Sequence, residues 1–283
     1  IWFVKKSVIK YSTDKSFIKQ RVSRSKKLSG FIPKIECYTE DMFSYKMVTG
    51  TVFSKKPTVN NFINLLNWLN KFWHHKCLSK KDKSKFNDIC NTFYMDKTYE
   101  RIDMFFRKFE IADSCSVLNG ISVDKVHELL KRVDWENLKH GVPVRFHGDL
   151  HFENILINKN TKEKFTLLDW RQSFGGLQDY GDLYYDLGKL LHGLIINHHI
   201  ISKNLFSIDV KKEIVEFDFN RTNNLVECEL YFYEWLSNNG MCLKKVKIIT
   251  ALIFLNISAL HHYPYSLLLF YLGKYRLHDA LEN

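Results

Sequence analysis

The sequence predicts an α+β fold in which one antiparallel hairpin is embedded among helices. The segments NILIN (154–158) and FTLLDW (165–170) are rich in apolar and β-branched residues, and the polar stretch 159–164 separates them, which is typical of two strands and a turn. Residues 60–73 and much of 225–272 instead repeat apolar side chains at helical spacing. With 283 residues, of which 45% are hydrophobic, the chain can bury a sizeable core around this arrangement.

The first fifty residues predict a small β-rich lobe. Residues 1–9 have the composition of a strand, and residues 12–28 begin with capping residues and continue as a basic helix. Residues 32–50 then give two short strands around a polar turn. Because so few strands cannot fold alone, we predict one small lobe at residues 1–50 and a large, mainly helical lobe at residues 51–283.

Composition argues against several classes of protein. The net charge is +11, and the basic residues are densest between residues 5 and 27, where Asp14 is the only acid. No nucleic-acid-binding motif accompanies them, so we interpret them as a solvated face and do not expect a nucleic-acid partner. The six cysteines form no C-x-x-C pair, which favours reduced thiols in a cytoplasmic protein. The apolar run 248–260 is too short to span a membrane and predicts a buried helix.

The stretch HGDLHFENIL (147–156) carries the chemistry. It places Asp149 five residues before Asn154, and Asp169 follows at the end of the next predicted strand. Phosphoryl transfer needs a carboxylate to accept the proton of the attacking hydroxyl and hard oxygen ligands to hold Mg²⁺. An Asp, an Asn five residues later and a second Asp across a hairpin are the order that protein kinases use. The three residues therefore predict a phosphoryl-transfer site.

Three motifs in this order resemble the aminoglycoside phosphotransferase and choline kinase family, which consists of small-molecule kinases with a protein-kinase-like two-lobe fold. The matching positions are His147, Gly148, Asp149 and Asn154, then Leu168, Asp169 and Trp170, and then Gly181, Asp182, Asp186 and Leu187. The resemblance implies that Asp149 is the catalytic base and that Asn154 and Asp169 hold Mg²⁺. It also implies that Asp182 and Asp186 brace the loop, although either could simply cap the following helix, and we interpret His147 as orienting it.

The N-terminal part resembles the family more loosely. Residues 2–8 resemble the strand whose lysine contacts the ATP phosphates, and we choose Lys6 for this role, with Lys5 beside it. Residues 42–50 resemble the strand that leads to the hinge, so the backbone near Met47 and Val48 would meet the adenine.

Two departures from the family pattern are visible in this part. The helix offers only Gln20 where the family has a glutamate that holds the lysine. No glycine-rich loop precedes Lys6, so the small lobe lacks its first strands. Since the chain also opens on Ile1 and shows no signal peptide, we expect an upstream domain or segment.

A later segment offers candidates for binding the phosphate acceptor. Carboxylates beside aromatic rings can hold an ammonium group, and four such residues would share one helix face. An amphipathic helix that packs its rings and exposes its carboxylates would show the same pattern. The sequence therefore does not decide whether the phosphate acceptor is an amino alcohol, an aminoglycoside or a sugar, including a sugar of surface polysaccharides. The four residues are Glu227, Tyr231, Glu234 and Trp235.

We predict an ATP- and Mg²⁺-dependent kinase that phosphorylates a hydroxyl of a small metabolite. Two alternatives are weighed against it. A zinc hydrolase could use His147, His151 and Glu153, but Gly148 argues against a helix here and no second histidine pair at helical spacing follows. A kinase-like module that binds a nucleotide or a partner without chemistry would keep the motifs and lack turnover.

Overall fold

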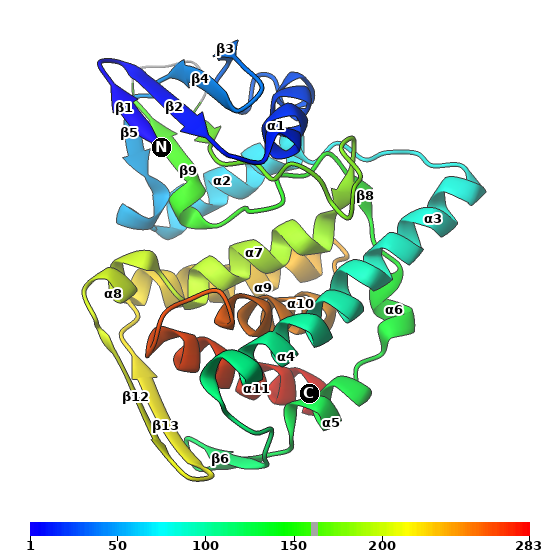
Figure 1. The fold of residues 1–283 in the computed structure, drawn as a ribbon, viewed down its shortest axis with the longest axis vertical. Coiled ribbons are helices and arrows are strands. Elements are labelled where there is room, and N and C mark those ends of the chain that lie inside the picture. Colours follow the sequence, from blue (N-terminus) through cyan, green and yellow to red (C-terminus); the bar gives the residue numbers. More distant parts are fainter. Residues whose placement is uncertain (160–163) are drawn as a thin grey trace. The chain divides into compact units, whose positions relative to one another are not determined.

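The structure is a computed structural model that describes residues 1–159 and 164–283 (Figure 1). The chain forms two compact units: unit 1 comprises residues 1–78 and 142–186, and unit 2 comprises residues 79–141 and 187–283. This division differs from the predicted boundary at residue 50. The reason lies in strand pairing, because the predicted hairpin adds its strands to the strand that begins at Gly50. Residues 160–163, which belong to the predicted turn 159–164, lie outside the described residues.

The described residues of unit 1 form three antiparallel sheets and two complete helices (Figure 1). The strand orders are β1-β2-β4-β3, β10-β9-β5 and β11-β8. The last four residues of the unit begin helix α7, which continues into unit 2. The elements are β1 (Trp2–Val4), β2 (Ser7–Tyr11), α1 (Lys15–Lys27), β3 (Ile35–Tyr38), β4 (Met42–Lys46), β5 (Gly50–Val52), a 3-10 turn (Phe53–Lys55), α2 (Val59–Phe72), β8 (Pro143–Val144), a 3-10 turn (Phe152–Asn154), β9 (Ile155–Asn158), β10 (Phe165–Leu167) and β11 (Gly181–Asp182).

The N-terminal segment is a hairpin, not the single strand that residues 1–9 predict. Strand β1 pairs antiparallel with β2, and Lys5 and Lys6 form the turn between them. Lys5 adopts a left-handed backbone conformation with φ 54°, which lets the chain reverse there. The helix that follows is confirmed: the Asp14 side chain accepts a hydrogen bond of 3.1 Å from the Phe17 amide and caps the N-terminus of α1.

Helix α2 supplies the core beneath the hairpin β9–β10. Its apolar stripe is confirmed, since the side chains at the predicted core positions are fully buried. Phe62 of α2 lies 6.0 Å from Phe152, measured between ring centroids, so the core reaches the 3-10 turn that precedes β9. This packing fixes the base of the HGDLHFENIL loop. The buried stripe of α2 comprises Phe62, Leu65, Leu66, Leu69 and Phe72.

Unit 2 is mainly helical and carries one further sheet (Figure 1). That sheet has the order β12-β13-β6-β7, in which β13 pairs parallel with β6. The elements are α3 (Lys80–Asn91), a π-helical turn (Thr92–Asp96), α4 (Lys97–Phe109), β6 (Ser116–Leu118), β7 (Ile121–Val123), α5 (Val126–Lys131), α6 (Trp135–Lys139), the remainder of α7 (Leu183–Ile195), α8 (His198–Ser202), β12 (Phe206–Lys211), β13 (Ile214–Phe219), α9 (Asn223–Asn238), α10 (Leu243–Ser258) and α11 (Tyr265–Glu282).

The apolar run 248–260 lies mostly in α10, where nearly every side chain is buried, so the predicted buried helix is confirmed. Helix α10 packs closely on α11: a Cβ added at Gly273 would lie 2.9 Å from Leu255 Cγ. Among the described residues, none of the helices combines the length and the apolar character that crossing a membrane requires.

Candidate active site

The loop that begins at His147 depends on a glycine. Gly148 has φ +88°, a conformation that side-chain-bearing residues rarely adopt. A Cβ at this position would also lie 2.7 Å from Arg171 Cβ and 2.9 Å from Phe146 Cε2. The glycine thus lets the backbone pass close to the segment after β10, and Asp149 follows directly.

The Asp186 carboxylate holds the backbone of the first residues of this loop. This fully buried carboxylate accepts hydrogen bonds from the amides of His147 (2.8 Å) and Gly148 (2.7 Å). The indole N–H of Trp73 donates a third, at 3.1 Å. Burial raises the pKa of Asp186 to about 6, although these three donors favour its charged form. The carboxylate therefore ties the loop to the start of α7 and to the end of α2.

His147 joins the loop to the strand that leads to Asp169. Its Nε2 lies 2.8 Å from the Leu168 carbonyl oxygen, and its Nδ1 accepts a hydrogen bond of 3.2 Å from the Asp149 amide. A neutral ring with its proton on Nε2 satisfies both contacts. Burial lowers the pKa of His147 to about 3, so the ring is neutral at physiological pH. Both ring nitrogens are engaged in holding backbone.

Asp149 and Asn154 face each other within the loop. Asn154 Nδ2 donates to the Asp149 carbonyl (2.9 Å) and lies 3.2 Å from the carboxylate Oδ2. His151 Nε2 is 3.4 Å from the same oxygen. The Asp149 side chain is 37% exposed whereas Asn154 is 7% exposed, so the carboxylate reaches solvent from a rigid, buried support. With its NH₂ directed at Asp149, Asn154 has its amide oxygen as the atom suited to a cation.

Asp169 has a left-handed backbone, with φ 55°. Such a conformation costs about 1 kcal/mol in a residue other than glycine and persists only where its surroundings impose it. The neighbours do so here, because the Leu168 amide donates to the Asn154 carbonyl (2.7 Å) and the Arg171 amide donates to the His147 carbonyl (2.9 Å). The backbone on either side of Asp169 is thus bonded to the loop that carries Asp149 and Asn154.

The lysine that meets Asp169 is Lys10. Its Nζ forms an ion pair with Asp169 Oδ1, and the residue is 8% exposed. Lys6, chosen from the sequence, lies exposed in the β1–β2 turn together with Lys5. Side chains alternate along a strand, so Lys10 shares the inward face of β2 with buried Val8. The choice of Lys6 rests on treating residues 1–9 as one strand; once the turn at residues 5–6 is known, the alternation points to Lys10.

Helix α1 contributes a second cation to Asp169. Arg21 Nη1 lies 3.4 Å from Asp169 Oδ1, and the Arg21 side chain is 15% exposed. Burial opposes ionisation of Asp169, but the hydrogen bonds and charges of Lys10 and Arg21 hold its pKa below the ordinary value. Gln20, the sequence candidate for holding the lysine, instead donates to Ser16 Oγ (3.1 Å) on the exposed face of the helix. Sequence reasoning did not single out Arg21.

Arg24 fixes α1 to the loop segments of unit 1. This 1% exposed guanidinium donates to the carbonyls of Phe146 (2.6 Å), Gln178 (3.1 Å) and Arg171. Its Cζ also lies 4.0 Å from the centroid of the Phe146 ring. Burial lowers the pKa of Arg24 to about 9, which leaves it charged at neutral pH. The sequence contained no signal for this role beyond a basic residue on the buried face of a helix.

The remaining N-terminal and supporting positions are also placed in unit 1. Met47 and Val48 follow the end of β4, and the Met47 amide donates to the Lys6 carbonyl (2.8 Å). Asp182 is fully buried, and its carboxylate accepts hydrogen bonds from the amides of Val142 (2.8 Å) and Tyr184 (3.2 Å). Asp182 therefore supports the β8–β11 pair, whose strand β8 leads into the loop.

The four acceptor candidates lie on α9 in unit 2, where they show the pattern of an amphipathic helix. Glu227 and Glu234 are exposed, Tyr231 is half-buried, and Trp235 is buried with its ring stacked on Phe232 at 6.0 Å between centroids. Among these four, the rings pack inward and the carboxylates point outward, as the alternative interpretation of this segment expects.

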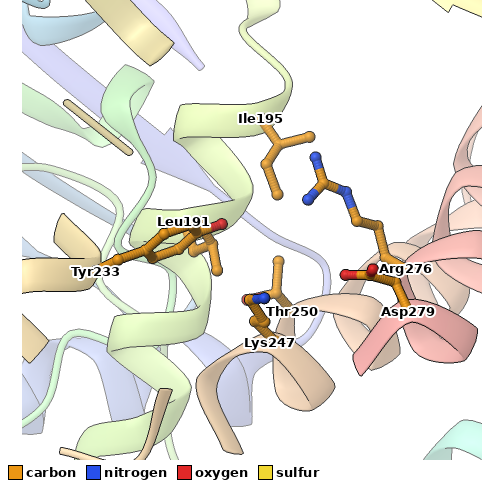
Figure 2. A pocket seen from close by; sticks show the side chains of 7 residues that line it. All are labelled: Leu191, Ile195, Tyr233, Lys247, Thr250, Arg276 and Asp279. Carbon is orange, nitrogen blue, oxygen red and sulfur yellow. The ribbon is translucent and has the colours of Figure 1, made fainter. Parts of the chain in front are cut away.

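The buried carboxylate of α9 is Glu229, which sequence reasoning did not select. It forms an ion pair with Arg221, accepts a hydrogen bond from the Tyr233 hydroxyl, and lies 3.8 Å from Arg276. Figure 2 shows the pocket beside this cluster. Its volume of ≈ 10 Å³ is that of about one water molecule, so it holds no acceptor. The pocket is lined by Leu191, Ile195, Tyr233, Lys247, Thr250, Arg276 and Asp279.

Comparison with known proteins shows which protein family the segment around this site resembles. One family model matches residues 105–200, a range that contains His147, Asp149, Asn154 and Asp169. This segment matches the phosphotransferase enzyme family. The resemblance that the motifs predicted is thereby confirmed. No curated protein matches the chain by sequence.

Superposition on a solved kinase structure confirms the predicted protein-kinase-like fold. The chain superposes on an ethanolamine kinase from Plasmodium vivax with a TM-score of 0.50 and 12% identity, over 97% of this chain and 75% of that one. It is also similar to a gentamicin–APH(2″)-IIa complex, with a TM-score of 0.46 and 14% identity over 96% and 84% of the two chains. For a choline kinase from Cryptosporidium parvum the values are 0.40 and 11%, over 96% and 77%.

The donor atoms of the phosphotransferase motif fit magnesium better than zinc. Mg²⁺ prefers hard oxygen ligands and usually takes one or two carboxylates together with water and phosphate oxygens. Asp169 and Asn154 offer such oxygens on adjacent, mutually bonded backbone segments. Within residues 1–159 and 164–283, no group of three or more His, Cys, Asp or Glu is arranged to hold a metal ion. Of the proposed zinc ligands, His147 has both ring nitrogens bonded to backbone groups.

Proposed function

We propose that this protein is a small-molecule kinase that transfers the γ-phosphoryl group of ATP to a hydroxyl group. The observation that carries the proposal is the loop in which Asp149 and Asn154 contact each other. Asp169 follows the next strand, and the backbone on either side of it is hydrogen-bonded to the two ends of that loop. The match of residues 105–200 to the phosphotransferase enzyme family supports the same reaction class. The kinase fold of the structural neighbour is consistent with it.

Asp149 is the proposed catalytic base. Its carboxylate accepts the proton of the acceptor hydroxyl, whose oxygen attacks the γ-phosphorus while the bond to the ADP oxygen breaks. Asn154 and His151 contact Asp149 and restrict where its carboxylate points. His147 and Asp186 hold the backbone of the loop, so they position the base and do not touch the substrate.

Asn154 and Asp169 are the proposed ligands of Mg²⁺, which when bound would neutralise charge on the phosphates. Lys10, which takes the place of Lys6, is the proposed phosphate contact, because it is the buried lysine beside Asp169. The backbone near Met47 and Val48 is the proposed adenine contact. Since the Met47 amide is bonded to the Lys6 carbonyl, we assign the contact to the other backbone groups of this segment.

The acceptor belongs to the class of small hydroxyl compounds, and an amino alcohol, an aminoglycoside or a sugar would each suit the reaction. Glu227, Tyr231 and Glu234 on α9 are the proposed acceptor contacts, because exposed carboxylates beside an aromatic ring attract an ammonium group. Trp235 is better explained as a packing residue, given its burial against Phe232.

The second candidate is a kinase-like module that binds a nucleotide or partner without turnover. One observation favours it: two cations already occupy Asp169, and Mg²⁺ must compete with both. Release of ADP from ATP and Mg²⁺ across choline, ethanolamine, aminoglycosides and sugars separates the candidates. Acceptor-dependent ADP release by the wild-type protein supports the kinase. ATP binding without ADP release for any member of the panel supports the module and contradicts the kinase.

A further inference from the structure

Arg21 occupies a constrained position at the candidate site. Its guanidinium lies 3.4 Å from Asp169 and rests over the Phe17 ring, with 4.6 Å between Cζ and the ring centroid. Its Nε is buried and has no hydrogen-bond partner within the described structure. A largely buried guanidinium with an unpartnered Nε–H is suited to an additional anionic oxygen.

The charge of Arg21 is opposite to that of the glutamate the family places on this helix. Arg21 cannot hold Lys10 by an ion pair, and both cations share one carboxylate instead. Lys10 and Arg21 both contact Asp169, and Asp149 also interacts electrostatically with Arg21, so two cations and two carboxylates balance at this site. Two adjacent cations can each contact a different oxygen of a polyanion such as a triphosphate once they are released from Asp169.

Two sets of hydrogen bonds hold the part of helix α1 that carries Arg21 in place beside Asp169. The Trp170 indole donates to the Arg21 carbonyl at 3.0 Å, and the carbonyl bonds of Arg24 hold the next turn of the helix. These contacts involve the Arg21 backbone and another side chain, so they survive replacement of the Arg21 side chain.

We propose that Arg21 is a second cationic contact for the nucleotide phosphates and that a divalent cation bound at Asp169 displaces its guanidinium from that carboxylate. The inference rests on the proposed function, since it assumes that a nucleotide binds beside Asp169. It has consequences of opposite sign: removing the guanidinium weakens phosphate binding and strengthens the binding of a divalent cation to Asp169.

Arg21→Gln tests both consequences by calorimetry with three probes: ATP with EDTA, adenosine with EDTA, and MgCl₂ alone. We expect metal-free ATP to bind about tenfold more weakly, as loss of one charged hydrogen bond predicts. Adenosine affinity is expected to stay unchanged and Mg²⁺ to bind more tightly. Arg21→Lys keeps the charge and should retain most of the metal-free ATP affinity.

Arg145→Gln is the matched control. Arg145 also rests over a phenylalanine, with its Cζ 4.4 Å from the Phe31 ring centroid, but it donates to the carbonyls of Phe72 and Lys71 and not to Asp169. The Arg145→Gln protein should bind ATP, adenosine and Mg²⁺ with the same affinities as the wild-type protein.

Several results would overturn the inference. Unchanged metal-free ATP affinity in Arg21→Gln contradicts it, and a parallel loss for ATP, adenosine and Mg²⁺ assigns Arg21 a purely structural role. Wild-type protein that binds ATP only with Mg²⁺ also contradicts it. Wild-type protein that binds neither ATP nor adenosine under any condition removes the proposed function and this inference together, so the two failures are distinguishable.

Discussion

Lys10 and Asp169 form an ion pair although 159 residues separate them in the sequence. The lysine lies on the inward face of β2, and the aspartate follows β10 in a left-handed backbone conformation. The pair brings together the cation proposed to contact phosphate and one ligand proposed for Mg²⁺. It links the N-terminal sheet of unit 1 to the loop that carries Asp149.

Lys10→Met should weaken ATP binding by about tenfold or more, because a buried charge-assisted contact is lost. Adenosine affinity should change little, since adenosine has no phosphate. Lys6→Met is the control, and its ATP affinity should equal that of the wild-type protein because Lys6 lies in an exposed turn. Calorimetric titration of the wild-type protein and both variants with ATP and with adenosine measures these affinities. A larger effect at Lys6 than at Lys10 would restore the choice made from the sequence.

His147 should make the protein acid-sensitive. Its pKa is about 6.5 when unfolded and about 3 when folded, so the buried neutral ring adds stability that is complete above pH 6.5 and lost as the pH falls toward 3. The free energy of unfolding should decrease by up to about 1.4 kcal/mol per pH unit in this window from this group alone. Urea unfolding between pH 7 and pH 4 measures the slope.

His147→Gln removes the titrating ring and should flatten that slope, whatever its effect on stability at pH 7. A slope that equals the wild-type slope would show that other groups cause the acid sensitivity. His198→Gln, at an exposed histidine, is the matched control variant.

Gly148→Ala should destabilise the protein more than Gly176→Ala. Both glycines have φ +88°, so alanine costs about 1 kcal/mol at either position through the backbone alone. At Gly176 the added Cβ meets nothing within 4 Å, whereas at Gly148 it collides with Arg171 and Phe146. We expect Gly148→Ala to lose at least about 2 kcal/mol in urea unfolding. Equal losses for the two variants would contradict the close approach described at Gly148.

Asp186→Ala should lower the free energy of unfolding by about 3 kcal/mol or more, because it leaves three buried N–H donors without their acceptor. Asp134→Ala, which removes an exposed helix cap on α6, should cost only about 1 kcal/mol. Thermal or urea unfolding compares them. Similar losses would mean that Asp186 does not hold the loop.

The sequence predicted what depends on local pattern and left out what depends on long-range contact. The hairpin β9–β10, the helices α1 and α2 and the buried helix α10 follow from periodicity and capping, and all are present. The sheet of unit 2 was not predicted, although residues 214–218 alternate exposed and buried side chains. Its parallel pairing joins Val215 to Leu118, far apart in sequence, and no local signal fixes such a partner.

The residues of the candidate site likewise divide into those that a local motif predicts and those that long-range contacts bring in. Asp149 and Asn154 lie in one short motif whose spacing is itself the signal. Lys10, Arg21 and Arg24 reach the site from a separate hairpin and helix, and their roles depend on which face of each element is buried. A lysine-rich segment gives no means to choose among its lysines until the turn between β1 and β2 is known.

Asp149→Asn tests the proposed catalytic base directly. Phosphorylated acceptor is measured by mass spectrometry, with whichever acceptor supports wild-type turnover. Asn cannot accept the hydroxyl proton, so kcat should fall by about 100-fold or more while ATP affinity stays close to the wild-type value. Glu40→Gln, an equivalent change at a carboxylate that is 78% exposed, should retain full activity. Wild-type kcat in Asp149→Asn would contradict the role of Asp149 as the catalytic base.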